Sequence, residues 1–224
     1  MSSPIIIAFD FSINKPAMCI YIDNKIDFYF WPINLDKTST EVLLANGIHV
    51  YDRNLDNIHD KEYDESSLIC EHVKRSTNLA KMIVKTINDI LSKYCISRDK
   101  YSDIIIANEG FAFGASGDAV LDLSGYKYIL MNELMQAGFK KFKTYAPTSL
   151  KATAGCKRGS SKEDMINHLG DELDSLHILF KNIKNDNMSL RKKKNYVKGL
   201  DDIADSYWCL KTTIKKEKID CWIA

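Results

Sequence analysis

The sequence predicts an α/β protein in which one mixed sheet is flanked by helices. Two apolar runs rich in β-branched residues, PIIIAFDF (4–11) and SDIIIANEGF (102–111), have the pattern of buried central strands. Between and after them, apolar residues recur at helical spacing in stretches that are too long to be strands. Strands that alternate with amphipathic helices are typical of a sheet covered by helices.

The remaining strands are expected next to the first one and after the second one. AMCIYI (17–22) and KIDFYFWPI (25–33) flank Asp23 and Asn24, which predicts a hairpin. KFKTYAP (141–147) predicts a short strand that Pro147 ends.

Four helices are predicted, at 66–95, 118–138, 160–173 and 199–214. The second ends at Gly138, a natural C-cap. The third has Ser160 or Ser161 as its N-cap, with an acid three residues further on.

The chain is expected to form a single domain, residues 1–224, with an insertion at about 35–66, where the apolar pattern is weak and acids are frequent. Residues 181–198 are polar and basic and are expected to form a loop or a mobile helical end. No internal repeat is found.

Composition limits the possible classes of function. The chain has 224 residues, 45% hydrophobic content and a formal net charge of +1, so it is neither disordered nor a polycation. Its six cysteines include no CxxC pair, which favours reduced thiols. Without a signal peptide or a run of about 18 apolar residues, we expect an intracellular protein (cytoplasm or nucleoid, or a host cell or organelle) with no membrane partner.

Two strands place an acid near their carboxyl ends. Asp10 shares a strand face with Ala8, and Glu109 shares one with Ala107, because side chains alternate along a strand. Both acids could simply be in solvent where the strands end. If the strands are neighbours, however, the two carboxylates face one point.

The last helix supplies more acids. Asp202 and Asp205 lie one turn apart in GLDDIADSYWCLKTTI, with Asp201 as an alternative partner for Asp205 at i, i+4. They could face water opposite the apolar arc of the helix. If they instead close a cluster with the strand acids, a hard divalent cation such as Mg²⁺ would relieve the repulsion. Two such ions suit phosphodiester hydrolysis.

With these acids in this order, the sequence resembles the RuvC-type Holliday-junction resolvases of the ribonuclease H-like nuclease superfamily. The resemblance implies a ribonuclease H-like sheet and two Mg²⁺ ions, with Mn²⁺ as a substitute. It implies that the ions are held by Asp10 in AFDFS, Glu109 in IIIANEGF, and Asp202 with Asp205 in DIADSYWCL. The longer excursion before Glu109 departs from the usual bacterial members, and such variation is familiar among viral and organellar relatives.

A second segment, YAPTSLKATAGCKRGSSKEDMI (145–166), is similar to the "APTEVK" stretch, glycine-bearing turn and "K-E-x-V" helix start of that family. The resemblance implies that Lys151 and Lys162 lie near the cut phosphate, with Lys162 as a catalytic residue. Lys157 and Arg158 add charge for DNA binding. Without the resemblance, this segment reads equally well as a solvated basic turn.

Aromatic and further basic residues complete the expected DNA interface. Phe111 and Phe113 could wedge between bases at a junction, or could pack into the core. The stretch RKKKNYVK (191–198) is expected to contact the DNA backbone, and Lys140, Lys141 and Lys143 could share that face. The five histidines show no ligand spacing.

The expected function is therefore Mg²⁺-dependent endonuclease cleavage of branched DNA, specifically of four-way junctions, by a homodimer. A related nuclease that cuts forks or flaps is the close alternative. Two other classes remain open, an actin-like ATP-binding protein and a non-catalytic junction binder. The first would need a second glycine-rich phosphate loop, and the second has no need of clustered carboxylates.

Overall fold

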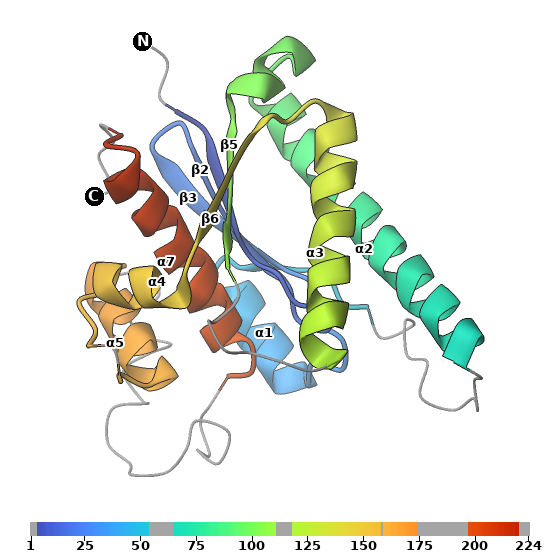
Figure 1. Cartoon of the computed structure of the whole chain (residues 1–224). Coiled ribbons are helices and arrows are strands. Elements are labelled where there is room, and N and C mark those ends of the chain that lie inside the picture. The colour runs from blue at the N-terminus through green and yellow to red at the C-terminus, as the bar shows by residue number, and fades with distance from the viewer. Residues whose placement is uncertain (1–3, 54–64, 111–117, 158, 174–196, 220–224) are drawn as a thin grey trace.

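One six-stranded mixed sheet runs through the protein, in the order β4-β3-β2-β1-β5-β6 (Figure 1). The computed structural model describes residues 4–53, 65–110, 118–157, 159–173 and 197–219. The strands are β1 (Ile6–Asp10), β2 (Ala17–Ile22), β3 (Lys25–Phe30), β4 (His49–Val50), β5 (Ile105–Glu109) and β6 (Lys141–Tyr145). β1, β2 and β3 pair antiparallel, whereas β5 runs parallel to β1 and to β6, and β4 runs parallel to β3.

The turn between β2 and β3 follows the predicted hairpin chemistry. Asp23 and Asn24 have φ values of 51° and 58°. Both central residues of a type I′ turn need positive φ, which Asp and Asn tolerate better than most residues. The hairpin prediction is confirmed.

Helices cover both faces of the sheet (Figure 1). They are α1 (Lys37–Ala45), α2 (Glu65–Lys93), α3 (Asp118–Ala137), α4 (Pro147–Thr153), α5 (Lys162–Glu172) and α7 (Leu200–Lys216), with a 3₁₀ turn η2 (Arg98–Asp103). α2 and α3 pack together on one face, and α7 lies across the other with α4 and α5 beside it. The predicted architecture, one mixed sheet flanked by helices, is confirmed.

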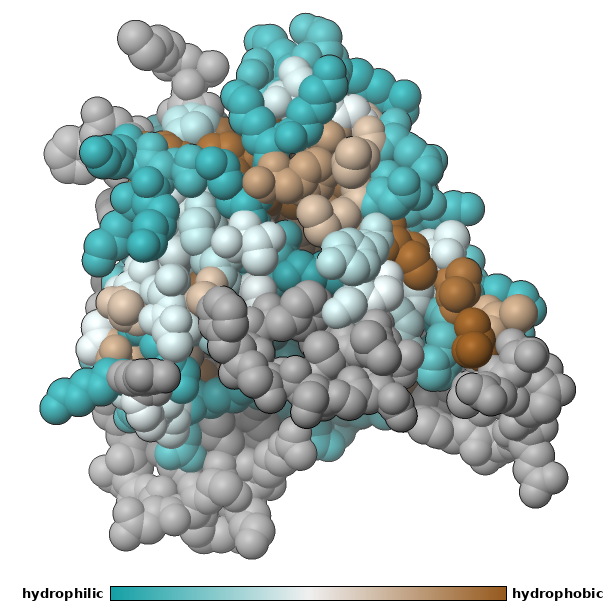
Figure 2. Space-filling model, in the orientation of Figure 1, coloured by the Kyte–Doolittle hydropathy of each residue, from teal (hydrophilic) through white to brown (hydrophobic). Residues whose placement is uncertain are grey.

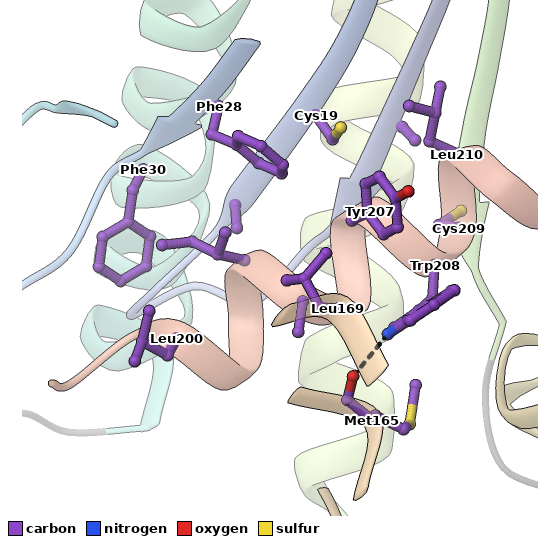
Figure 3. Close-up of a cluster of buried hydrophobic side chains, with 14 of the residues drawn as sticks. Cys19, Phe28, Phe30, Met165, Leu169, Leu200, Tyr207, Trp208, Cys209 and Leu210 are labelled. Atoms are coloured by element: carbon purple, nitrogen blue, oxygen red, sulfur yellow. Dashed lines mark hydrogen bonds between the residues drawn. The ribbon is translucent and has the colours of Figure 1, made fainter. Parts of the chain in front are cut away.

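The core beneath α7 fixes the position of that helix. Small residues of the sheet, Ala8 and Ala107 among them, are fully buried and let α7 approach closely. Trp208 is buried as well, and its indole Nε1–H donates to the carbonyl oxygen of Met165 in α5 at 2.9 Å (Figure 3). A buried indole N–H needs such a partner, so this bond ties α5 to α7.

Two parts of the structure differ from expectation. The segment 35–66, where the apolar pattern is weak, includes α1 and the edge strand β4. Leu43 of α1 and Ile48, just before β4, are buried in the core. β4 therefore adds a strand to the edge of the sheet and α1 leads to it, while 54–64 lie outside the described residues. Pro147 follows β6, as predicted, but it also opens α4, a helix that the sequence analysis missed. Proline suits the first helical position because its missing N–H has no partner there.

The surface of α2 carries an apolar stripe. Ile69 and Val73 are 58% and 50% exposed, and Figure 2 shows brown atoms along this helix. No helix in the described part of the chain is long and apolar enough to cross a membrane.

Candidate active site

The two strand acids end side by side. β1 and β5 are parallel, and their register pairs Ala8 with Ala107 and Phe9 with Asn108. The next residue of each strand is Asp10 in β1 and Glu109 in β5. Parallel neighbours end at the same edge of a sheet, so the expectation that these strands are adjacent is confirmed.

The start of α7 is held at the same edge. Its N-cap, Gly199, has a φ of +95°, and a Cβ there would lie 2.4 Å from the ring of Phe30. Lys198 pairs with Asp36 before α1, with Nζ 3.2 Å from the carboxylate oxygen Oδ2. α7 therefore enters the site at a fixed point, which the segment before α1 helps to define.

The acids of α7 are not a solvated stripe. Asp205 is 7% exposed and lies among buried residues of the helix, and Asp202 is half-buried. The alternative that both aspartates face water is therefore wrong for Asp205. Burying a carboxylate is costly unless a cation or hydrogen-bond donors compensate.

Asp10, Glu109, Asp202 and Asp205 form one electrostatic group, which we call the acid cluster. Burial raises the pKa of Asp10 well above its usual value, and the other three acids raise it further. Burial, with the charge of Asp205, raises the pKa of Glu109 to about 7. Burial, with the charge of its neighbour Asp201, raises the pKa of Asp202 to about 8, and burial also raises that of Asp205.

Asp201 and Asp202 take different places. Asp202 is among the charges that raise the pKa of Asp10, whereas Asp201 pairs with Lys162. The choice of Asp202 over Asp201 as the partner of the strand acids stays a prediction from the sequence spacing.

Lys162 lies against the cluster from the start of α5. Its Nζ is 3.3 Å from the Oδ2 atoms of both Asp201 and Asp205. Burial lowers the pKa of Lys162, but the surrounding acids raise it more, so it stays protonated. Ser161 caps α5, since its side chain accepts from the backbone N–H of Asp164 and that acid accepts in return from Ser161 N–H. This capping box fixes Lys162 as the first residue of the helix.

Lys151 holds the basic turn. Its Nζ donates to the carbonyl oxygen of Ser160 at 2.7 Å, which ties α4 to the residue before the α5 cap. Lys157 is exposed in the same turn. Arg158, Phe111, Phe113 and residues 191–196 lie outside the described residues, so their predicted DNA contacts remain predictions.

Three lysines predicted to share a face with residues 191–198 lie in β6 or directly before it. β6 runs parallel to β5, so its start is at the opposite end of the sheet from Glu109. Lys140 and Lys141 are at that start, and Lys141 pairs with Asp103 at 2.9 Å. Lys143 pairs with Glu217, with Nζ 2.7 Å from the carboxylate oxygen Oε2. Lys140 and Lys141 therefore lie toward the other end of the sheet from Glu109, whereas Lys143 lies beside Ala107. That the three lysines share a face with residues 191–198 stays a prediction, because 191–196 lie outside the described residues.

Sequence analysis missed one charged residue at the site, Lys127. It is 7% exposed on α3, and its ammonium donates to the carbonyl oxygen of Glu109. The sequence does contain a signal for this residue, because Lys127 falls on the apolar arc of the helix with Leu130 and Leu134. A lysine at a core position needs a polar partner.

The donors of the acid cluster suit a hard divalent cation. All four are carboxylates, and burial together with mutual repulsion raises their pKa values, which a bound cation would reverse. Within the described ranges, however, no three His, Cys, Asp or Glu side chains lie close enough to form a ready-made metal site. The donor chemistry fits Mg²⁺, and the side chains would have to draw closer together to hold it.

Comparisons with known proteins find similarity in structure but not in sequence. No protein-family model and no curated protein match the chain. A structure of Thermus thermophilus RuvC is 9% identical, with a TM-score of 0.47 over 96% of this chain and 97% of that one. T. thermophilus RuvC in complex with a Holliday junction substrate is 8% identical, with a TM-score of 0.46 over 96% and 95%. Function is therefore argued from the side chains of this chain.

Proposed function

We propose that this chain is a Mg²⁺-dependent endonuclease that cuts branched DNA, with four-way junctions as its preferred substrate. The observation that carries the proposal is the acid cluster, in which acids from β1, β5 and α7 shift one another's pKa values at one edge of the sheet. Such a group does not help folding, because clustered carboxylates that are partly or fully buried repel one another and lose hydration. A function that uses a divalent cation accounts for their presence.

The acids and the lysines of the site have different roles in this proposal. Asp10, Glu109, Asp202 and Asp205 would hold the metal ions, with Mn²⁺ able to replace Mg²⁺. When bound, such ions supply a nucleophilic water and stabilise charge on the phosphate. Lys162, with 53% of its side chain exposed, can reach a phosphate outside the cluster and stabilise the charge that develops there. Lys151 orients the turn that carries Lys162 toward that phosphate.

The basic turn would bind the DNA backbone. Lys157 is exposed in it, and Arg158 belongs to the same segment. Phe111 and Phe113 are two and four residues after Glu109 in the sequence, and an aromatic ring in this segment could unstack a junction. Phosphate contacts of this kind predict binding that weakens steeply with salt.

A four-way junction has two-fold symmetry, so paired nicks require two matched active sites. The proposal therefore includes a C2 homodimer. The apolar side chains exposed on α2 and α3, such as Ile69, Val73 and Met135, offer a surface for that contact.

Cleavage of labelled synthetic substrates tests the proposal. A four-way junction, a fork, a flap and a linear duplex are each incubated with Mg²⁺ and with EDTA. Paired symmetric nicks on the junction, lost in EDTA, are the expected result. Cutting of forks or flaps instead would keep the chemistry and change the substrate, and no cutting of any substrate would contradict the proposal.

A further inference from the structure

The acid cluster has a second lysine beside it, which approaches from the other face of the sheet. Lys162 comes from α5, on the α7 face, and is half-exposed. Lys127 comes from α3, which packs with α2 on the opposite face, and is 7% exposed. A buried ammonium costs free energy unless it is paired, so its partners indicate its role.

The partners of Lys127 belong to the acid cluster and its surroundings. Its ammonium donates to the backbone carbonyl of Glu109, the last residue of β5. Burial lowers the pKa of Lys127, while the nearby Cys209, Glu109 and Asp10 raise it. In return, the charge of Lys127 lowers the pKa of Glu109. The direct contact of the ammonium is thus with the last residue of β5, one of the two strand acids.

The contact with Glu109 is made at the point where β5 leaves the sheet. The next amide, Gly110 N–H, donates to the carbonyl oxygen of Tyr145 at 2.7 Å. A Cβ on Gly110 would lie 3.2 Å from the side chain of Thr144, so the backbone runs close to β6 there. The end of β5 is thus held by β6 on one side and by Lys127 from α3.

We propose that Lys127 is a positioning residue of the active site. It fixes the carboxyl end of β5 so that the Glu109 side chain stays turned toward the cluster, and it supplies a constant positive charge behind the acids. This inference rests on the proposed nuclease function. Because the ammonium is buried, it acts on the geometry and charge of the acids and makes no contact with DNA.

This role predicts a specific split between binding and rate. Removing the ammonium takes a repelling positive charge away from the metal site, so attraction for a cation does not fall. Removing the hydrogen bond lets Glu109 shift, and a displacement of about 1 Å in an active site can slow a reaction by about 100-fold. Loss of rate without loss of metal affinity distinguishes positioning from general damage to the fold.

The test compares K127M, which removes the charge, with K127R, which keeps it, and with K85M as a control. Lys85 is on α2, with 78% of its side chain exposed. Single-turnover junction cleavage at saturating Mg²⁺ should fall by about tenfold or more in K127M and recover at least partly in K127R. The half-saturating Mn²⁺ concentration and junction affinity in Ca²⁺ should not rise. Wild-type rates in K127M, or equal losses in K127M and K127R, would overturn the inference.

Hydrogen–deuterium exchange separates this inference from the proposed function. The Gly110 amide should exchange several-fold faster in K127M than in wild type, with or without metal. If wild type neither binds Mn²⁺ nor cuts DNA, the proposed function fails while faster exchange still supports the fixing of β5. Unchanged exchange in folded K127M contradicts it. If K127M does not fold, K127L allows the same comparison, because it also lacks both the charge and the hydrogen-bond donor.

Discussion

Lys162 and Asp205 form an ion pair between α5 and α7, with Nζ 3.3 Å from the carboxylate oxygen Oδ2. The lysine side chain is 53% exposed and the aspartate side chain is 10% exposed. The pair therefore links the buried acids to the surface where a phosphate would arrive. One lysine can stabilise the acids in the free protein and contact DNA in the complex.

Replacing Lys162 with Ala should slow cleavage more than it weakens binding. A donor aimed at developing charge typically contributes about 100-fold to the rate, whereas one phosphate contact is a small part of DNA affinity. Single-turnover cleavage and filter binding in Ca²⁺ measure the two effects. Lys85→Ala, at an exposed site on α2, is the control. An unchanged cleavage rate would contradict this role and would mean that Lys162 only stabilises the structure.

The metal-free protein should lose stability as pH rises from about 5 to 8. The usual pKa values are 4.5 for Glu109 and 3.8 for Asp202, and in the folded protein they are raised to about 7 and about 8. The folded state then binds more protons than the unfolded state between these limits, so stability is present at low pH and is lost as these groups ionise. Urea unfolding in EDTA at several pH values measures the slope.

Asp202→Asn should make that pH slope shallower, since one of the acids with a raised pKa is removed. Asp89→Asn, which alters an aspartate with 58% of its side chain exposed, should not. Identical slopes in wild type and Asp202→Asn would show that the acids do not interact in the folded protein.

Asp10→Asn should separate activity from stability. Cleavage should fall by more than about 100-fold, because a proposed metal ligand is lost. In EDTA, the melting temperature should rise, since a buried carboxylate with a raised pKa becomes neutral. Junction binding in Ca²⁺ should remain. If the variant still cuts DNA at the wild-type rate, Asp10 is not a metal ligand of the active site.

Gly199→Ala should destabilise the protein through the start of α7. The positive φ costs about 1 kcal/mol for alanine, and the overlap with Phe30 adds about 1–3 kcal/mol. Gly47→Ala is the matched control, because Gly47 has a φ of +77° but no atom within 4 Å of a Cβ. Denaturant unfolding should show a larger loss for Gly199→Ala. Equal losses would mean that Phe30 moves aside freely.

Local patterns predicted the parts of the site that follow from local rules. Strand alternation put Asp10 and Glu109 two residues beyond alanines of the same face, and parallel pairing brought the acids to one edge. Helical spacing put Asp202 and Asp205 on one side of α7. The N-cap of α5 followed from Ser161 and Asp164.

Other parts depend on contacts between distant segments. β4 is two residues long and pairs only because α1 returns the chain to the edge of β3. Lys127 is polar on an apolar arc, and only the place of α3 against the end of β5 explains it. The end of β6 nearest the acids could not be inferred until its parallel pairing with β5 was known. Tertiary pairing decides such features, so local patterns leave them open.

Calorimetric titration of Mn²⁺ into the metal-free protein tests the acid cluster as a metal site most directly. Wild type and Asp89→Asn should show the same saturable binding, and Asp10→Asn should bind at least about tenfold more weakly. Absence of saturable binding to wild type, or equal binding to Asp10→Asn, would contradict the account and leave the acids without a metal to hold.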